Sequence, residues 1–248
     1  MFTEFDLHLG ADQKNISKDF VVITDTDIDG NFLLNHFISH FLQKNAKVCL
    51  FGLGQVQSHY AAACHKIGVN IQAAIAKKQF VFVDTLRMLF DGFLADSSDS
   101  NHLFSSVTDT DSLKPLLELV KAVVSENAPS IVLIDDLCAL VNIGISVQVI
   151  ADFLHYCKTL TVERDITFVF LSHLNQDDPE YSLLHSWLKQ YVTLEINVRA
   201  LKSGYSKDLS GDMSITWDNR YHQTKQLHFK LLDKDVKFYA LGTSSVVL

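Results

Sequence analysis

The sequence predicts a three-layer α/β fold, in which helices cover both faces of a mostly parallel central sheet. Three observations support this prediction: apolar runs of strand length recur along the chain, helical periodicity fills the gaps between them, and after about residue 191 alternating strands replace the helices. Continuous β-branched and aromatic runs are typical of strands buried on both faces, as in parallel sheets. Regular alternation of such strands with helices indicates an α/β domain.

The expected parallel strands are the apolar runs FVVIT (20–24), KVCLFGL (47–53), QFVFVDTL (79–86), SIVLIDDL (130–137), ITFVFLSHL (166–174) and YVTLEINV (191–198). Amphipathic segments separate them, such as the stripe of Phe32, Phe37 and Phe41. Three later segments are predicted to be short antiparallel strands, the last two joined at Asp233-Lys234: GDMSITW, QLHFKLLD and DVKFYAL. We therefore expect a single domain over residues 1–248, with its antiparallel strands at the C-terminal end.

The composition is that of a globular protein without an obvious nucleic-acid or membrane signature. Hydrophobic residues make up 48% and the formal net charge is −8, so nucleic-acid binding would need a local basic patch or partners. The longest uncharged run, residues 137–151, has about 15 residues and is shorter than the ~18 of a membrane span. The four cysteines form no CxxC pair, which favours reduced buried thiols over a metal site. These features predict a cytoplasmic location, with a nuclear one as the alternative.

One segment departs from the core pattern. Residues 95–111, ADSSDSNHLFSSVTDTD, are rich in Ser and Asp and poor in apolar residues. This composition predicts an exposed acidic loop.

The junction FVVITDTDIDGNFL has the layout of a phosphate-binding loop without its chemistry. Such a loop has the form GxxxxGK[ST] between a strand and a helix. Aligned on Gly30, the first Gly is replaced by Asp25, the Lys by Asn31 and the Ser/Thr by Phe32. The charge that reaches the phosphates and the hydroxyl that ligates Mg²⁺ are therefore both missing. We expect a degenerate loop that does not bind ATP in the usual way.

The loop at residues 25–30 also fits the first half of a calcium loop. Asp25, Asp27 and Asp29 would supply oxygen ligands, and Gly30 the sharp turn. However, His36 stands where the bidentate Glu belongs, and a strand rather than a helix precedes the loop. A simpler interpretation is that Asp27 or Asp29 caps the helix that begins near Gly30.

A phosphatase of the haloacid-dehalogenase type is the enzymatic alternative. DIDGNF resembles the DxDGT signature of that class, with Asp27 as nucleophile and Asp29 as acid/base. Ser172 and the pair Asp135/Asp136 would supply the later motifs, but the acidic pair should follow the Ser rather than precede it.

Further patterns carry less chemistry. Asp135 and Asp136 end an apolar strand, where a nucleotide hydrolase holds Mg²⁺ through water, so a weak nucleotide hydrolase is a second enzymatic alternative. FGLGQVQ lacks the third Gly of a dinucleotide fingerprint. His36 and His40 have i,i+4 spacing with no third ligand evident, and the adjacent Ser172 and His173 do not make a triad. We interpret these histidines as structural and expect no cofactor and no metal.

The order of these elements matches a RecA-like core of the phosphate-loop NTPase class: a strand, a degenerate phosphate loop, alternating helices and strands, an acidic-ended strand, FVFLSHL and then antiparallel strands. More specifically, the chain resembles the family of sixth subunits of the Elongator complex over nearly its whole length. The stretches that carry the resemblance are DGNFLLNHFISHFL, AKVCLFGLGQVQSHY with KIGV, IVLIDDL, VIADFLHYCK and DKDVKFYALG.

The resemblance implies a non-catalytic ring subunit. The fourth, fifth and sixth subunits of that complex form a heterohexamer with two copies of each. This accessory ring binds tRNA and is linked to its ATP-dependent release, while another subunit performs the acetyl transfer that modifies the wobble uridine. No membrane contact is implied.

The ring would place two pore loops after IVLIDDL and FVFLSHL. The first, CALVNIGIS, has no basic residue, and the second, NQDDPEYSLLHSWLKQ, has three acids before Lys189. Phosphate contacts need Lys or Arg, so the best candidates for tRNA contacts are Arg199, Lys202 and Lys207. An ordinary solvated surface is the alternative interpretation of that cluster.

Overall fold

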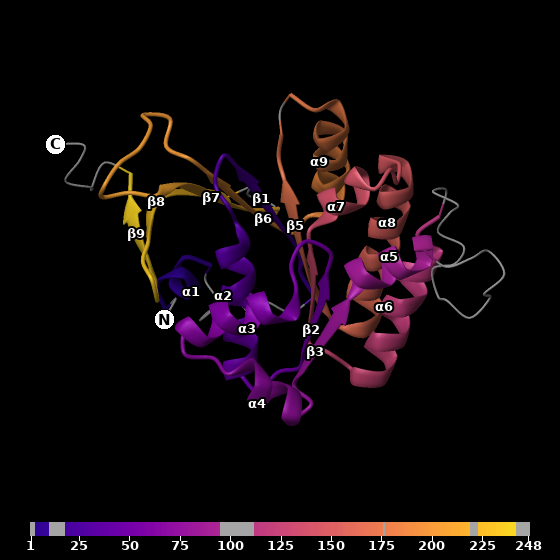
Figure 1. Ribbon diagram of the computed structural model, residues 1–248. Helices are drawn as coiled ribbons and strands as arrows, with labels where there is room; N and C mark the ends of the chain where they lie inside the picture. Colours follow the sequence, from indigo (N-terminus) through magenta and orange to yellow (C-terminus); the bar gives the residue numbers. More distant parts are fainter. Residues whose placement is uncertain (1–2, 10–17, 95–111, 176, 219–222, 242–248) are drawn as a thin grey trace.

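A computed structural model describes residues 3–9, 18–94, 112–175, 177–218 and 223–241, so the predicted acidic loop at 95–111 lies outside the described residues. Within these ranges the chain forms a nine-stranded sheet in the order β3-β2-β4-β5-β1-β6-β7-β8-β9 (Figure 1). The parallel strands are β1 (Phe20–Thr26), β2 (Val48–Gly52), β3 (Phe80–Asp84), β4 (Ile131–Asp135), β5 (Thr167–His173) and β6 (Leu194–Arg199).

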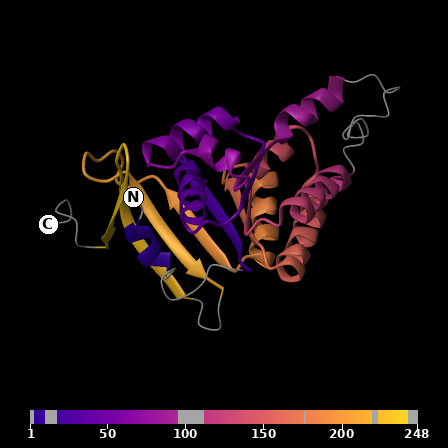
Figure 2. The ribbon, with the colours of Figure 1, turned by 90° about the horizontal axis from the view of Figure 1, so that it is seen from below.

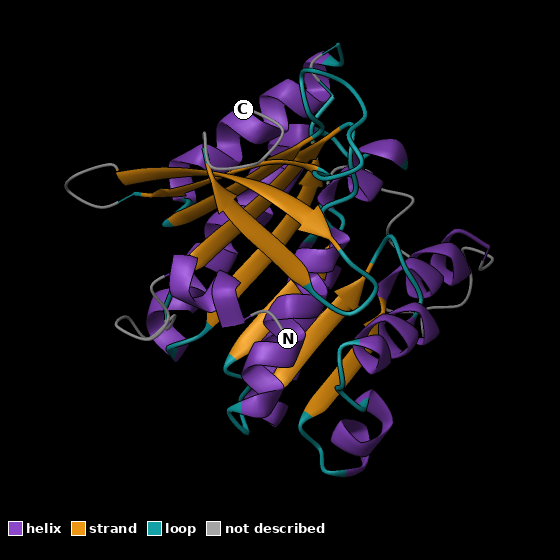
Figure 3. Ribbon diagram, turned by 90° about the vertical axis from the view of Figure 1, so that its left-hand side faces the viewer, coloured by secondary structure: helices purple, strands orange, loops and turns teal. Residues whose placement is uncertain are grey.

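Three antiparallel strands extend the sheet beyond β6. They are β7 (Gly211–Trp217), β8 (Gln223–Leu231) and β9 (Val236–Ala240). A tight turn joins β8 to β9, closed by the Leu232 N–H donating to the carbonyl of Asp235. Figure 3 shows these strands nearest the viewer, in front of the parallel part of the sheet. The predicted mixed sheet is thus confirmed.

Two helical layers cover the sheet, as Figure 2 shows from below. The first layer consists of α1 (Thr3–Leu9), α2 (Asn31–Gln43), α3 (Gln57–Lys66) and α4 (Ile71–Ala76). The second consists of α5 (Thr85–Leu94), α6 (Lys114–Asn127), α7 (Leu137–Asn142), α8 (Val147–Arg164) and α9 (Pro179–Tyr191). Alternate residues of the central strands enter one core or the other. On β1, for example, Val21 and Ile23 pack on the first layer and Phe20 and Val22 on the second.

The antiparallel strands bury only one face. The inward side chains of β6 to β9, such as Ile215 and Phe229, join the core beneath α1 and α2. The residues between them on β7 and β8 are polar and partly exposed, including Asp212, Ser214 and His228. This alternation is the pattern expected of an antiparallel sheet with one wet face.

The boundaries differ from the predicted ones in places. The last parallel strand begins at Leu194 rather than 191, because Tyr191 ends α9 and Leu194 is the first residue that pairs with β1, opposite Val21. The two segments predicted as pore loops are largely helical: CALVNIGIS contains most of α7, and NQDDPEYSLLHSWLKQ most of α9. Side-chain caps explain both helices, since Asp136 accepts from the Cys138 N–H and Asp178 from the Glu180 N–H.

Candidate functional site

The carboxyl ends of β1, β4 and β5 meet at one edge of the sheet. These strands are neighbours in the order β4-β5-β1, and all run in the same direction. Strands β4 and β5 end in Asp135 and His173, Asp25 is the last residue but one of β1, and Asp136 follows directly after β4. In open α/β sheets this edge is where ligands bind. The degenerate loop and the strand-end acids therefore share one candidate site.

The loop after β1 uses its own carboxylates to satisfy its backbone. Asp25 accepts a 2.7 Å hydrogen bond from the Gly30 N–H, and Asp29 a 2.8 Å bond from the Asn31 N–H. Asp29 thus bonds the first N–H of α2, while the N-cap position itself is Gly30, which has no side chain to cap the helix. A β-carbon on Gly30 would lie 3.1 Å from the Asp25 carboxylate, so a side chain there would crowd this contact. The N–H groups that face an anion in a working phosphate loop are occupied here by the chain itself.

The residues at the Lys and Ser/Thr positions of the loop are turned to packing. Asn31 is only 9% exposed, at the start of α2. Phe32 lies against Phe229 of β8, with ring centroids 5.5 Å apart. It belongs to the core between α2 and the antiparallel strands, where a hydroxyl ligand of Mg²⁺ would have no role.

Asp135 is a buried carboxylate held by neutral donors. Its Oδ2 accepts a hydrogen bond from the Tyr60 hydroxyl of α3 and a 3.1 Å bond from the Gln55 N–H. Burial raises the pKa of Asp135 to about 6, against the opposing effect of the Tyr60 bond. The Gly-rich turn that resembled a dinucleotide fingerprint thus donates to the chain's own acid.

Asp136 faces a cation and a helix start. One oxygen caps α7 through the Cys138 N–H at 2.9 Å, and the other lies 3.4 Å from His173 Nε2. Burial raises the pKa of Asp136, and the nearby His173 counteracts this shift. Asp136 therefore anchors α7 and is half of an ion pair.

His173 connects the strand ends. Its Nδ1 lies 2.6 Å from Asp25 Oδ1, directly across the β1–β5 pairing, where Asp25 and His173 are register partners. The hydrogen bond to Asp25 raises the pKa of His173 to about 9, although partial burial opposes the shift. At neutral pH the ring is thus an imidazolium held between Asp25 and Asp136.

The charged and hydrogen-bonding groups at these strand ends are paired with one another. We call Asp25, Tyr60, Asp135, Asp136 and His173 the closed strand-end cluster. The N–H groups of Gly30, Asn31 and Gln55 bond to the carboxylates of Asp25, Asp29 and Asp135. The imidazole ring of His173 lies between Asp25 and Asp136. A phosphate entering here would have to displace these carboxylates and meet their repulsion. The edge retains the position of a nucleotide site, but its donors are already used.

Sequence reasoning missed Tyr60 and His173 as members of this cluster. Tyr60 comes from a helix far from the acids in the chain, and no motif marks it. His173 was interpreted as structural by its adjacency to Ser172. The available signal was its place at the end of the strand ITFVFLSHL, at the same edge as IVLIDDL.

Asp27 lines a pocket whose lining includes no other residue of the predicted phosphatase set. It adopts a left-handed φ of 58° and lines a pocket of about 430 Å³ with the segment 200–210. Ser172 is buried, and its hydroxyl lies 3.5 Å from Cys138 Sγ. One oxygen of Asp25 and one of Asp29 accept backbone N–H groups of the loop.

The basic residues lie beyond the carboxyl end of β6. Arg199 ends that strand, while Lys202 and Lys207 are exposed in the segment that leads to β7. Between them, Tyr205 is 93% exposed. Other residues of this segment, including Leu201, Gly204 and Tyr205, line the pocket that Asp27 also lines.

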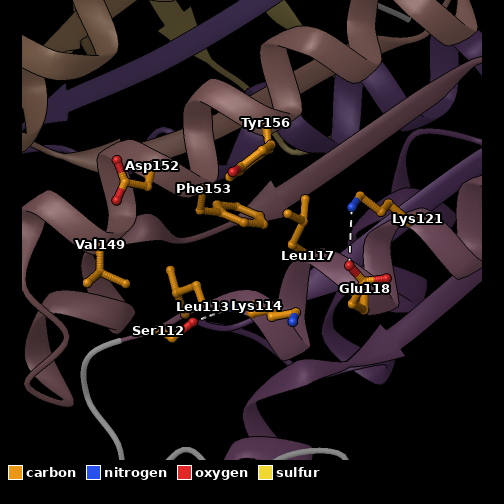
Figure 4. Close-up of a pocket in the computed structure, with 10 residues that line it drawn as sticks. All are labelled: Ser112, Leu113, Lys114, Leu117, Glu118, Lys121, Val149, Asp152, Phe153 and Tyr156. Carbon is orange, nitrogen blue, oxygen red and sulfur yellow. Dashed lines mark hydrogen bonds and ion pairs between the residues drawn. The ribbon is translucent and has the colours of Figure 1, made fainter.

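A separate groove of about 330 Å³ lies between α6 and α8 (Figure 4). Its charges are balanced, because Lys114 and Lys121 are matched by Glu118 and Asp152. Lys121 lies 3.1 Å from Glu118. None of the strand-end residues lines this groove.

Comparison with known proteins identifies the family. The model of the family described as Elongation complex protein 6 matches residues 2–236. The chain belongs to this family. Among curated relatives, Elongator complex protein 6 is 31% identical in Danio rerio and 32% in Homo sapiens, with all of each chain covered. The Drosophila melanogaster protein of the same name is 26% identical over 99% of both chains.

A solved structure supports the fold independently. The KaiC-like protein of Pyrococcus horikoshii OT3 matches with a TM-score of 0.62, covering 90% of each chain at 12% identity. At that identity the likeness shows the fold alone. This member of the Elongation complex protein 6 family therefore has a RecA-like fold. Within the described ranges, no helix has the length and apolarity to cross a bilayer.

Proposed function

We propose that this chain is a non-catalytic RecA-like subunit of the Elongator accessory ring, folded as one domain over residues 1–248. It forms a heterohexamer with the fourth and fifth subunits, two copies of each, and acts in the cytoplasm with the catalytic Elongator subunits. The ring binds and releases tRNA and thereby supports modification of the wobble uridine.

The closed strand-end cluster carries the non-catalytic part of this proposal. A phosphoryl-transfer site needs a cation or backbone donors for the phosphate and a free carboxylate for Mg²⁺. Here Asp25, Asp135 and Asp136 bind the chain's own donors, and the cation is His173. The ring and its binding of tRNA come from the family resemblance. The closed strand-end cluster supports a subunit that has a RecA-like fold but does not itself hydrolyse nucleotide.

Exposed apolar side chains support a subunit that is covered by neighbours. Tyr156 and Val162 on α8 are 51% and 70% exposed, and Leu183 on the adjacent α9 is 51% exposed. These helices form one flank of the sheet. These three are among the eight large apolar side chains that are exposed in the described residues, and we infer that the flank they occupy meets a neighbouring subunit.

Co-expression with the fourth and fifth subunits tests the ring. We expect the three chains to co-purify at equal stoichiometry, with a native mass of two copies of each. The isolated chain should self-associate. A well-behaved monomer that binds neither paralogue would contradict the proposal.

A turnover assay on the purified chain tests the enzymatic alternatives. We expect no Mg²⁺-dependent hydrolysis of ATP or of a phosphate monoester above a blank preparation. Turnover that Asp27→Asn abolishes would instead establish a phosphatase, and turnover that Asp135→Asn abolishes a nucleotide hydrolase.

The basic segment after β6 gives a second prediction. Reversing Lys202 and Lys207 to Glu in the assembled ring should weaken tRNA binding by about 3- to 10-fold and flatten its dependence on salt, because phosphate contacts are lost. Reversal of the exposed Lys77 and Lys78, just before β3, is the matched control. Equal losses in both variants would show a general charge effect rather than a contact at the segment after β6.

A further inference from the structure

The N-terminal helix supplies the third ligand that the histidine pair in the sequence lacks. His36 and His40 project from one face of α2, one turn apart. Asp6 of α1 reaches both rings through the same oxygen. Its Oδ1 lies 3.0 Å from His36 Nε2 and 2.9 Å from His40 Nδ1. All three ligand atoms lie within 4.8 Å of one another.

We infer that Asp6, His36 and His40 form a binding site for a divalent transition-metal ion, best suited to Zn²⁺. A tetrahedral Zn²⁺ at about 2.0 Å from each ligand atom separates these atoms by roughly 3.3 Å. The two Asp6 contacts are already close to that separation, and the two ring nitrogens lie within 4.8 Å of each other, so the remaining adjustment falls on the rings. Two imidazoles and one carboxylate are borderline ligands, which favour Zn²⁺ over Mg²⁺ or Ca²⁺.

The surroundings suit a partly closed site. The side chains of His36 and His40 are 3% and 8% exposed, while that of Asp6 is 24% exposed. Water can therefore reach the site from the Asp6 side and fill a fourth position.

The rings are fixed by aromatic neighbours. Phe5 meets His36 edge to face with centroids 4.7 Å apart, and Phe41 meets His40 in the same manner at 5.6 Å. Packing that locks the ligand rotamers lowers the cost of assembling a metal site.

A metal at this site would join α1 to α2 and, through α1, hold the last strand β9. Helix α1 lies between α2 and β9 (Figure 1), where Phe5 stacks on Phe238 and Glu4 accepts from the Phe238 N–H at 3.3 Å. An ion that joins α1 to α2 would therefore also secure the last strand of the sheet. The role that we assign to it is structural.

Cobalt titration of the full chain, purified without a histidine tag and stripped with a chelator, tests the site. We expect one equivalent of Co²⁺ to give visible d–d bands and an equimolar amount of Zn²⁺ to bleach them. Asp6→Asn should weaken binding by at least tenfold, because an amide is a poor ligand for these ions. It should keep the metal-free fold, since the amide has the size and shape of the carboxylate that lies beside both rings. His8→Gln, on the same helix but outside the cluster, is the matched control.

Hydrogen exchange gives a readout that does not depend on colour. Zn²⁺ should slow exchange of the α1 amides in the wild-type chain and leave Asp6→Asn unchanged. His40→Gln should behave like Asp6→Asn. The inference fails if Co²⁺ gives no stoichiometric bands, or if Asp6→Asn and His40→Gln bind the metal as tightly as His8→Gln.

Discussion

Replacement of His173 by Ala is expected to lower the free energy of unfolding by about 1–3 kcal/mol at pH 7. The imidazolium lies between Asp25 at 2.6 Å and Asp136 at 3.4 Å, and its loss leaves two largely buried carboxylates without their cation. Removing one partner of a fully buried ion pair costs about 3–5 kcal/mol. The smaller value takes into account that the His173 side chain is 42% exposed and partly screened by water.

The dependence on pH identifies the cause of this loss. The pKa of His173 is raised to about 9 in the folded chain, from 6.5. The stabilisation is therefore complete below about pH 6.5 and disappears as the pH rises through about 9. Urea unfolding of both proteins between pH 6 and pH 10 should show a difference that narrows as the pH rises.

Two further variants control this experiment. His155→Ala removes an exposed histidine of α8 and should change stability by less than about 0.5 kcal/mol. Asp136→Asn, added to His173→Ala, should recover part of the loss because it removes one of the uncompensated charges. A difference between wild type and His173→Ala that stays constant up to pH 10 would attribute the effect to packing instead.

Replacement of Tyr60 by Phe is expected to cost about 2–3 kcal/mol at pH 8. Tyr60 is fully buried, and its hydroxyl donates to Asp135, which is 1% exposed. Burial and the carboxylates around it raise the pKa of Tyr60, so the phenol remains a donor throughout the working pH range. Without it, a buried carboxylate keeps mainly the Gln55 N–H, and an unsatisfied buried charge is expensive.

Acidic conditions should relieve this loss. Because the pKa of Asp135 is raised to about 6, the folded state binds the proton more tightly than the unfolded chain, and ionisation costs stability as the pH rises. The loss in Tyr60→Phe should therefore shrink to about 1 kcal/mol at pH 5, where Asp135 is largely protonated. Thermal unfolding at the two pH values measures this change.

A double-mutant cycle with Asp135→Asn isolates the pair. In the Asn background, Tyr60→Phe should cost only about 1 kcal/mol, because position 135 then carries no charge for the phenol to stabilise. Tyr181→Phe is the control for a hydroxyl with a neutral partner, because Tyr181 donates to Asn142 near the surface. The same cost in both backgrounds would show that Tyr60 acts through packing rather than through the carboxylate.

The sequence was sufficient for the parallel sheet because its strands are buried on both faces. Runs such as IVLID and TFVFLSH are too apolar to be stable on a surface, so they must be buried strands. Their order along the chain is that of a RecA-like fold. The sequence also predicts a degenerate phosphate loop, because Asn31 and Phe32 occupy the positions of the Lys and the Ser/Thr.

The closed cluster depends on pairings that no local pattern contains. Asp25 meets His173 only because β1 and β5 pair in the register that aligns them, and Tyr60 meets Asp135 across 75 residues of chain. Helices α7 and α9 were missed for a different reason. Their segments contain polar and helix-breaking residues, and side-chain caps at Asp136 and Asp178 stabilise them once the fold is in place.

The central position of β1 has a consequence for how the protein is made. Its partner β5 is synthesised roughly 140 residues later and its partner β6 roughly 170 residues later, which takes on the order of 10–30 s at ~5–20 residues per second. During that interval an apolar strand waits without hydrogen-bonding partners on either side. The nascent chain is thus most vulnerable to aggregation late in its synthesis, and a chain cut short before β5 has no means of completing its sheet.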